Sequence, residues 1–127
     1  MTTSSPKPKT RTITLTDRPP VRVNEADWPL VASATGDSWG TSGDYCRHEQ
    51  AHSLRVRRHE DGRALVYGVL DAAGPWTGSE SRKGGVLLEA GSSAAELVSA
   101  IREVGADVGI PESLIRECVA DLPAEQL

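Results

Sequence analysis

The chain has no phenylalanine, and its 127 residues include only three tryptophans and two tyrosines. Aromatic side chains supply a large part of the buried area in most cores. Without them, the core must be built mainly from Val, Leu, Ile and Ala. The length fits one domain, and a domain of this size has a single core.

Two further absences narrow the class of protein. No apolar run approaches the ~20 residues needed to span a bilayer, and residues 1–10 (MTTSSPKPKT) lack the apolar stretch of a secretion signal. Cys46 and Cys118 are the only cysteines, and they are too few and too far apart to suggest a disulfide framework. We therefore expect a cytoplasmic protein with no membrane partner.

Charge is unevenly distributed along the chain, whose net charge is −4. Residues 1–63 hold ten Lys and Arg against eight Asp and Glu, whereas residues 64–127 hold four against ten. This asymmetry suggests a polar interaction surface. A dedicated nucleic-acid-binding domain is usually basic overall, and this chain is not.

The first third of the chain predicts two short extended segments and a helix. Alternating β-branched residues predict a strand over residues 11–16 (RTITLT), and residues 21–23 form a second extended piece. Asn24 is a suitable N-cap for a short helix that runs to about Ala34. Residues 35–51 contain three glycines and many polar residues, and they predict a long loop.

The middle of the chain predicts a β-hairpin followed by another strand. Residues 53–71 (SLRVRRHEDGRALVYGVLD) form two strand-like runs around Asp61-Gly62, which is a strong turn signal. The polar stretch 74–82 then leads into residues 83–89, which predict a further strand.

Two registers of this hairpin can be considered. A two-residue loop places Val56 opposite Tyr67 and leaves Arg55 and Arg57 on the other face, whereas a three-residue loop places Arg55 opposite Tyr67 and Arg57 opposite Leu65. If a single face of the sheet is buried, the first register is favoured, because it gathers the apolar residues on that face.

The C-terminal third predicts two helices. Ser93 and Glu96 form a capping box at the start of the first helix, which Gly109 ends. Pro111 starts the second helix and Pro123 ends it. The apolar residues that recur at helical spacing are Leu97, Val98, Ile101, Val104 and Val108, then Leu114, Ile115, Cys118, Val119 and Leu122.

This order of elements predicts an α+β domain over residues 11–127. The expected architecture is an antiparallel sheet of about four strands, with a short N-terminal helix and two C-terminal helices packed on one face. Residues 1–10 are predicted to form a disordered tail, because they contain almost nothing apolar.

One short motif suggests metal chemistry. His48 and His52, with Glu49 between them, have the H-E-x-x-H spacing of zinc proteases, in which both histidines lie on one helical face. Gln50 occupies a position that is usually apolar in such enzymes, and the predicted strand from Ser53 leaves no room to continue a helix. We interpret the motif as accidental and keep a zinc metalloprotease only as an alternative.

A structural zinc site is a weaker version of the same idea. Its candidate ligands are Cys46, His48 and His52, with His59 as a fourth. The alternative is that these are ordinary residues of a polar loop, and we expect no catalytic residue, no metal and no cofactor.

Two groups of residues suggest a binding surface. The predicted hairpin carries a basic cluster, Arg55, Arg57, Arg58, His59 and Arg63, suited to phosphates or to an acidic partner. The predicted loops carry Trp39, Tyr45 and Trp76, which suit recognition of a protein or a base. The alternatives are a solvated sheet face for the arginines and core-edge packing for the aromatics.

The predicted C-terminal helices form a third candidate surface, because they carry many carboxylates and only two arginines. Such a face is usually just solvated, although it can also imitate a nucleic acid and occupy the basic groove of another protein.

Three segments carry a resemblance. RTITLTDRPPVRVNEADWP, LRVRRHEDGRALVYG and ECVADLPAEQL resemble a family of small proteobacterial proteins often carried on plasmids, prophages or other mobile elements. The resemblance implies no activity and no functional residue, but it implies an accessory role, such as inhibition of a host defence system. We therefore expect a non-enzymatic protein that binds another macromolecule, in the first place a protein; a nucleic-acid-binding regulator that uses the basic hairpin is an alternative.

Overall fold

The computed structural model describes residues 9–42, 46–74 and 78–123. They form six strands followed by two helices. These are β1 (Thr10–Ile13), β2 (Val21–Asn24), β3 (Leu30–Ser42), β4 (Cys46–Arg58), β5 (Ala64–Gly74), β6 (Gly78–Leu88), α1 (Ala94–Val108) and α2 (Glu112–Asp121).

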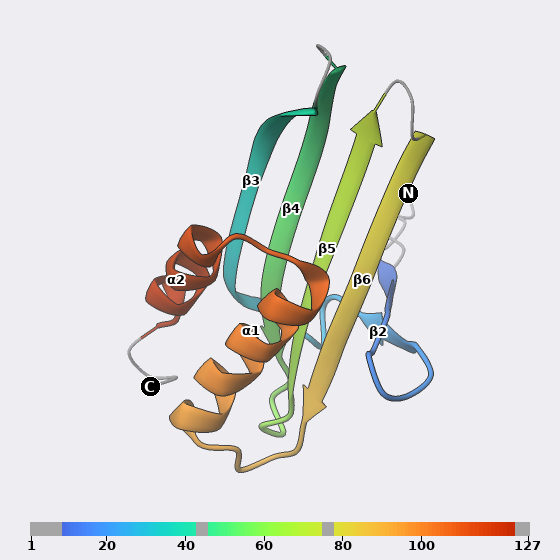
Figure 1. Cartoon of the computed structure of the whole chain (residues 1–127). Helices are drawn as coiled ribbons and strands as arrows, with labels where there is room; N and C mark the ends of the chain where they lie inside the picture. Colours follow the sequence, from blue (N-terminus) through green and yellow to red (C-terminus); the bar gives the residue numbers. More distant parts are fainter. Residues whose placement is uncertain (1–8, 43–45, 75–77, 124–127) are drawn as a thin grey trace, which may run out of the picture.

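The strands form two antiparallel sheets. The larger sheet has the order β3-β4-β5-β6, so each strand pairs with the next one along the chain, and β1 and β2 pair with each other as a two-stranded ribbon. Figure 1 shows α1 and α2 on one face of the large sheet and β2 behind the opposite face. The predicted α+β class, with an antiparallel sheet and two C-terminal helices, is confirmed.

The helices and the large sheet enclose the main core. Leu54 and Val56 of β4 and Val66 of β5 are fully buried against α1 and α2. The predicted apolar stripes supply the other side of this core, through Leu97, Ile101, Val104, Val108, Ile115, Cys118 and Leu122, and Ala100 is buried beside them. An aliphatic core is what a chain without phenylalanine must build.

A second, smaller core lies on the opposite face of the sheet. Leu65 and Tyr67 of β5 pack there against residues of the ribbon and its flanking segments, which are Ile13, Leu15, Val23 and Trp28. Both faces of the sheet are therefore covered at this end of the molecule.

This second core explains why the favoured hairpin register is wrong. In the structure Arg55 lies opposite Tyr67, Arg57 opposite Leu65 and Val56 opposite Val66. The favoured register requires a single buried face, but successive residues of β5 are buried on alternate faces, so apolar residues need not gather on one side. The three-residue loop is the one that forms.

The predicted N-terminal helix is also wrong, because Asn24 caps a turn. Asn24 Oδ1 accepts a hydrogen bond from Ala26 N at 3.0 Å, and its carbonyl oxygen accepts one from Asp27 N at 3.0 Å. The turn ends at Trp28, whose side chain is buried in the second core. Pro29 disfavours a helical conformation at Trp28, the residue that precedes it. The chain then enters β3 at Leu30.

The predicted loop over residues 35–51 is replaced by strands. β3 continues to Ser42 and β4 begins at Cys46, with backbone pairing from Ala32–Val56 to Ser42–Cys46. The predicted polar stretch 74–82 likewise contains the first residues of β6, which begins at Gly78. Cross-strand backbone hydrogen bonds define these segments, although their sequences show no strand pattern.

The predicted helix ends are present. Ser93 Oγ accepts a hydrogen bond from Glu96 N at 3.1 Å at the start of α1, and Gly109 ends it with φ of 91° in the left-handed region. Neither helix in the described part of the chain is long and apolar enough to cross a bilayer.

Candidate functional site

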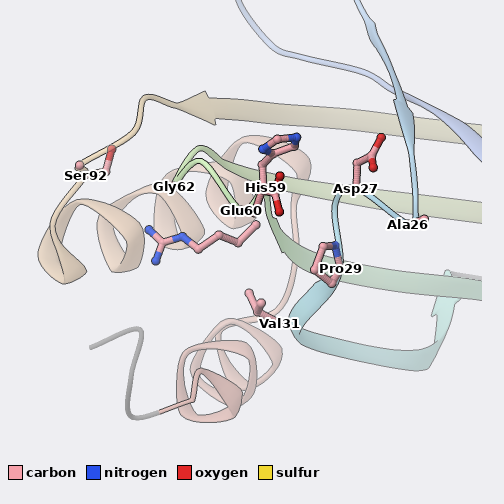
Figure 2. Close-up of a pocket in the computed structure, with 10 residues that line it drawn as sticks. Ala26, Asp27, Pro29, Val31, His59, Glu60, Gly62 and Ser92 are labelled. Atoms are coloured by element: carbon pink, nitrogen blue, oxygen red, sulfur yellow. The ribbon is translucent and has the colours of Figure 1, made fainter.

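A groove lies at the end of the sheet, beside the β4–β5 turn. It has a volume of about 690 Å³ and is lined by three separate segments of chain. These are residues 26–31 before and in β3, residues 58–62 around the turn, and residues 91–92 before α1. Figure 2 shows Ala26 and Asp27 on one side of this end groove and Ser92 on the other.

The β4–β5 turn is held by hydrogen bonds within the turn itself. His59 and Arg63 close it, since His59 N donates to Arg63 O at 2.9 Å, and Gly62 supplies the left-handed conformation with φ of 99°. Asp61 accepts from Arg63 N at 2.9 Å and from Arg63 Nε at 2.7 Å. The backbone N–H of Arg63 is the largest of the influences that lower the pKa of Asp61. The turn is therefore a preorganised edge of the groove.

Trp28 joins this turn to the rest of the molecule. Its ring lies 5.0 Å from that of His59, tilted by 60°, and the guanidinium carbon of Arg63 lies 5.1 Å from the Trp28 ring centroid. A cation over an indole face is attracted by its quadrupole. Two of the predicted binding residues, His59 and Arg63, are thus brought together, by a tryptophan that the sequence analysis had assigned to a helix.

Arg57, in contrast, lies inside the molecule and not on the expected binding surface. Only 8% of the residue is exposed. Its Nε donates to Tyr67 Oη at 2.8 Å, its Nη1 donates to Trp28 O at 3.1 Å, and its Nη2 lies 3.7 Å from Glu25 Oε1. These contacts make Arg57 the polar centre of the second core.

The remaining arginines of the predicted basic cluster face in different directions. Arg58 lines the end groove. Arg55 is half-buried on the ribbon-covered face and lines a separate small pocket with Arg11 and Lys83. The structure therefore divides the cluster between two faces of the sheet, because neighbouring residues of a strand point to opposite sides.

The H-E-x-x-H motif lies on a strand. His48 and His52 are four residues apart in β4, which corresponds to about 13 Å along a strand and only about 6 Å along a helix. The strand removes the helical geometry on which the zinc-protease alternative depends. His52 is 5% exposed, and its backbone lies opposite Gly36 of the neighbouring strand β3. Among the described residues, no group of three His, Cys, Asp or Glu is arranged to hold a metal ion.

Several predicted residues cannot be placed in a site. The side chains of Trp39, Cys46 and His48 are outside the described part of the structure, and so are Tyr45 and Trp76 as whole residues. Asp27, Glu60 and Ser92 also line the end groove, and none of them was predicted as a site residue. No local signal could have found them, because only the fold brings their three segments together.

The chemistry of the end groove suits binding. Ala26, Pro29 and Val31 supply apolar surface, and Asp27 and Glu60 are exposed carboxylates with no ion pair to any described residue. The Ser92 hydroxyl donates to Glu89 O at 2.7 Å, so it is engaged with backbone.

No family model matches the chain, and neither a curated protein nor a solved structure is found to be similar to it.

Proposed function

We propose that this protein is a non-enzymatic binding protein whose end groove takes a segment of another protein. The observation that carries the proposal is the groove itself, in which Pro29 and Val31 lie beside the free carboxylates of Asp27 and Glu60. A partner segment with Lys or Arg next to an apolar side chain complements this surface. Leu30, which is 46% exposed, extends the apolar surface at the start of β3.

Two features favour a protein over a nucleic acid as the partner. Arg57 is buried and Arg63 is paired with Asp61 at 2.7 Å, so two cations of the predicted basic cluster are already engaged internally. The carboxylates of Asp27 and Glu60 would repel phosphates that approach Arg58 and His59. A nucleic-acid-binding regulator remains the alternative.

The cellular role belongs to the same proposal. We place the protein in the cytoplasm and, from the resemblance of its sequence to proteins of mobile elements, assign it an accessory role such as inhibition of a host defence system. Such a role requires binding of a host protein and no chemistry of its own.

A photo-cross-linking experiment tests the proposal. A photoreactive amino acid is placed at Val31 in the groove, or at the exposed Ser113 on α2 as a control, and the protein is irradiated in a proteobacterial cell. We expect a discrete protein adduct from position 31 only. The double variant Asp27→Lys/Glu60→Lys should abolish this adduct.

A matched charge change supplies the control. Glu103→Lys/Glu117→Lys makes the same change of charge on exposed helix residues outside the groove and should leave the adduct intact. No adduct at Val31, or one that survives the groove reversal, would refute the proposal. Binding to random double-stranded DNA with an affinity that falls steeply with salt would instead support the nucleic-acid alternative.

A further inference from the structure

A second pocket lies between the ribbon and the large sheet, on the face opposite the helices. Its volume is about 120 Å³, and the charged residues that line it are all cationic: Arg11, Arg55 and Lys83. They come from β1, β4 and β6 respectively. We refer to the space between these three residues as the cationic pocket.

Strand register explains why these residues converge. Arg55 lies opposite Tyr67, and Tyr67 lies opposite Gly85, so all three positions are on the ribbon-covered face. Lys83 is two residues before Gly85 and therefore shares this face. A side chain at Gly85 would bring its Cβ to 2.7 Å from Thr14 O, so glycine allows the segment after β1 to lie directly on the sheet.

The positive charge in the pocket is only partly compensated. Glu25 accepts a hydrogen bond from Arg11 Nε at 2.8 Å, and this hydrogen bond is the main cause that lowers the pKa of Glu25. The same carboxylate lies 3.7 Å from the buried Arg57. Within the described part of the chain, Arg55 and Lys83 form no ion pair. A concavity lined by cationic side chains attracts an anion.

We propose that the cationic pocket binds a single phosphate group, with Arg55 and Lys83 as its main ligands. Its volume of about 120 Å³ suits one tetrahedral oxyanion and is too small for a nucleoside. A guanidinium donates two parallel hydrogen bonds to phosphate oxygens, and an ammonium adds a point charge. The phosphate is either inorganic or the head of a small phosphomonoester, whose remainder would extend out of the pocket. This inference is independent of the end groove.

The experiment is a calorimetric titration of the whole chain with inorganic phosphate and, separately, with glycerol 3-phosphate, at constant ionic strength set by chloride. Saturable binding of either probe is expected, and the tighter of the two identifies the source of the phosphate. Amide resonances of Gly68 and Gly84, which line the pocket, should shift in parallel.

Variants connect the binding to the pocket. Arg55→Ala should weaken it by at least about tenfold, since a hydrogen bond to a charged group is lost. Lys83→Ala should weaken it severalfold, and because Lys83 is exposed this variant tests the site without a risk to folding. Arg102→Ala, an equal loss of charge on the exposed face of α1, should leave the affinity unchanged. Absence of saturable binding, or equal weakening by all three variants, would overturn the proposal.

Discussion

Replacing Arg57 with alanine should lower the free energy of unfolding by about 3 kcal/mol. The guanidinium makes two buried hydrogen bonds, to Tyr67 Oη at 2.8 Å and to Trp28 O at 3.1 Å. Hydrogen bonds that involve a charged group contribute about 1.5–3 kcal/mol each. Part of this sum is offset, because the folded variant no longer has to desolvate a guanidinium.

Equilibrium unfolding in urea measures the effect. With an m-value of about 2 kcal/mol/M, the loss shifts the unfolding midpoint downward by about 1.5 M. Arg55→Ala is the matched control, because Arg55 lies two residues away on the same face and has no ion pair among the described residues. Its loss should cost less than about 1 kcal/mol.

A second variant examines the pairing itself. Tyr67→Phe removes the acceptor of Arg57 Nε and should destabilise by about 1 kcal/mol. The double variant Arg57→Ala/Tyr67→Phe should lower the free energy of unfolding by less than the sum of the two single changes, because each single change already removes the same hydrogen bond between Arg57 and Tyr67. If Arg57→Ala unfolds at the same urea concentration as Arg55→Ala, Arg57 is a surface residue and the reasoning on the second core is refuted.

Three further predictions concern other parts of the fold. Alanine is more favourable than glycine inside a helix by ~1 kcal/mol, but Gly105→Ala should still destabilise the protein. The new Cβ would lie 2.6 Å from the Ile115 side chain, and overpacking of this kind costs about 1–3 kcal/mol. A rise in melting temperature would contradict this prediction. Because its folded-state pKa is lowered, Glu25 contributes stability that is present above pH 4.5, its ordinary pKa, and is lost as the pH falls further. Glu25→Gln should therefore flatten the acid limb of stability against pH, and an unchanged limb would argue against the ion pair. Burial raises the pKa of Cys118 to about 12, so in a Cys46→Ser variant a thiol reagent at pH 8 should react only after denaturant is added. Fast reaction of the native protein would show that this thiol is not buried between α2 and the sheet.

The C-terminal helices could be predicted because their signals are local. The Ser93 cap, the Gly109 stop and the apolar spacing from Leu97 to Val108 all lie within the segments that they define, and the structure contains each of them. Local signals of this kind are reliable when packing agrees with them.

The sheet was harder to predict because its determinants lie far apart in sequence. The hairpin register depends on whether the ribbon of residues 10–24 covers the second face, and nothing within the hairpin reports this. The strands β3 and β4 extend beyond both helices (Figure 1), and backbone pairing along the ladder defines them there. Asn24 favours both a helix cap and a tight turn, and tertiary packing of Trp28 decided between them.

The candidate site could be predicted only in part for the same reason. His59, which lines the groove, could be selected because it lies beside a recognisable Asp61-Gly62 turn. Asp27 and Ser92, the acid and the hydroxyl that complete the groove, come from segments that only the finished fold brings to that turn.

The order in which the chain covers its sheet has a consequence for synthesis on the ribosome. The ribbon that covers one face precedes the strands, whereas α1 and α2, which cover the other face, follow them. A growing chain can thus close the Leu65–Tyr67 face as soon as β5 emerges, while Leu54, Val56 and Val66 stay exposed to water until residues 94–122 have left the exit tunnel. During that interval the nascent protein presents an apolar sheet surface, which is the stage at which it most needs a chaperone.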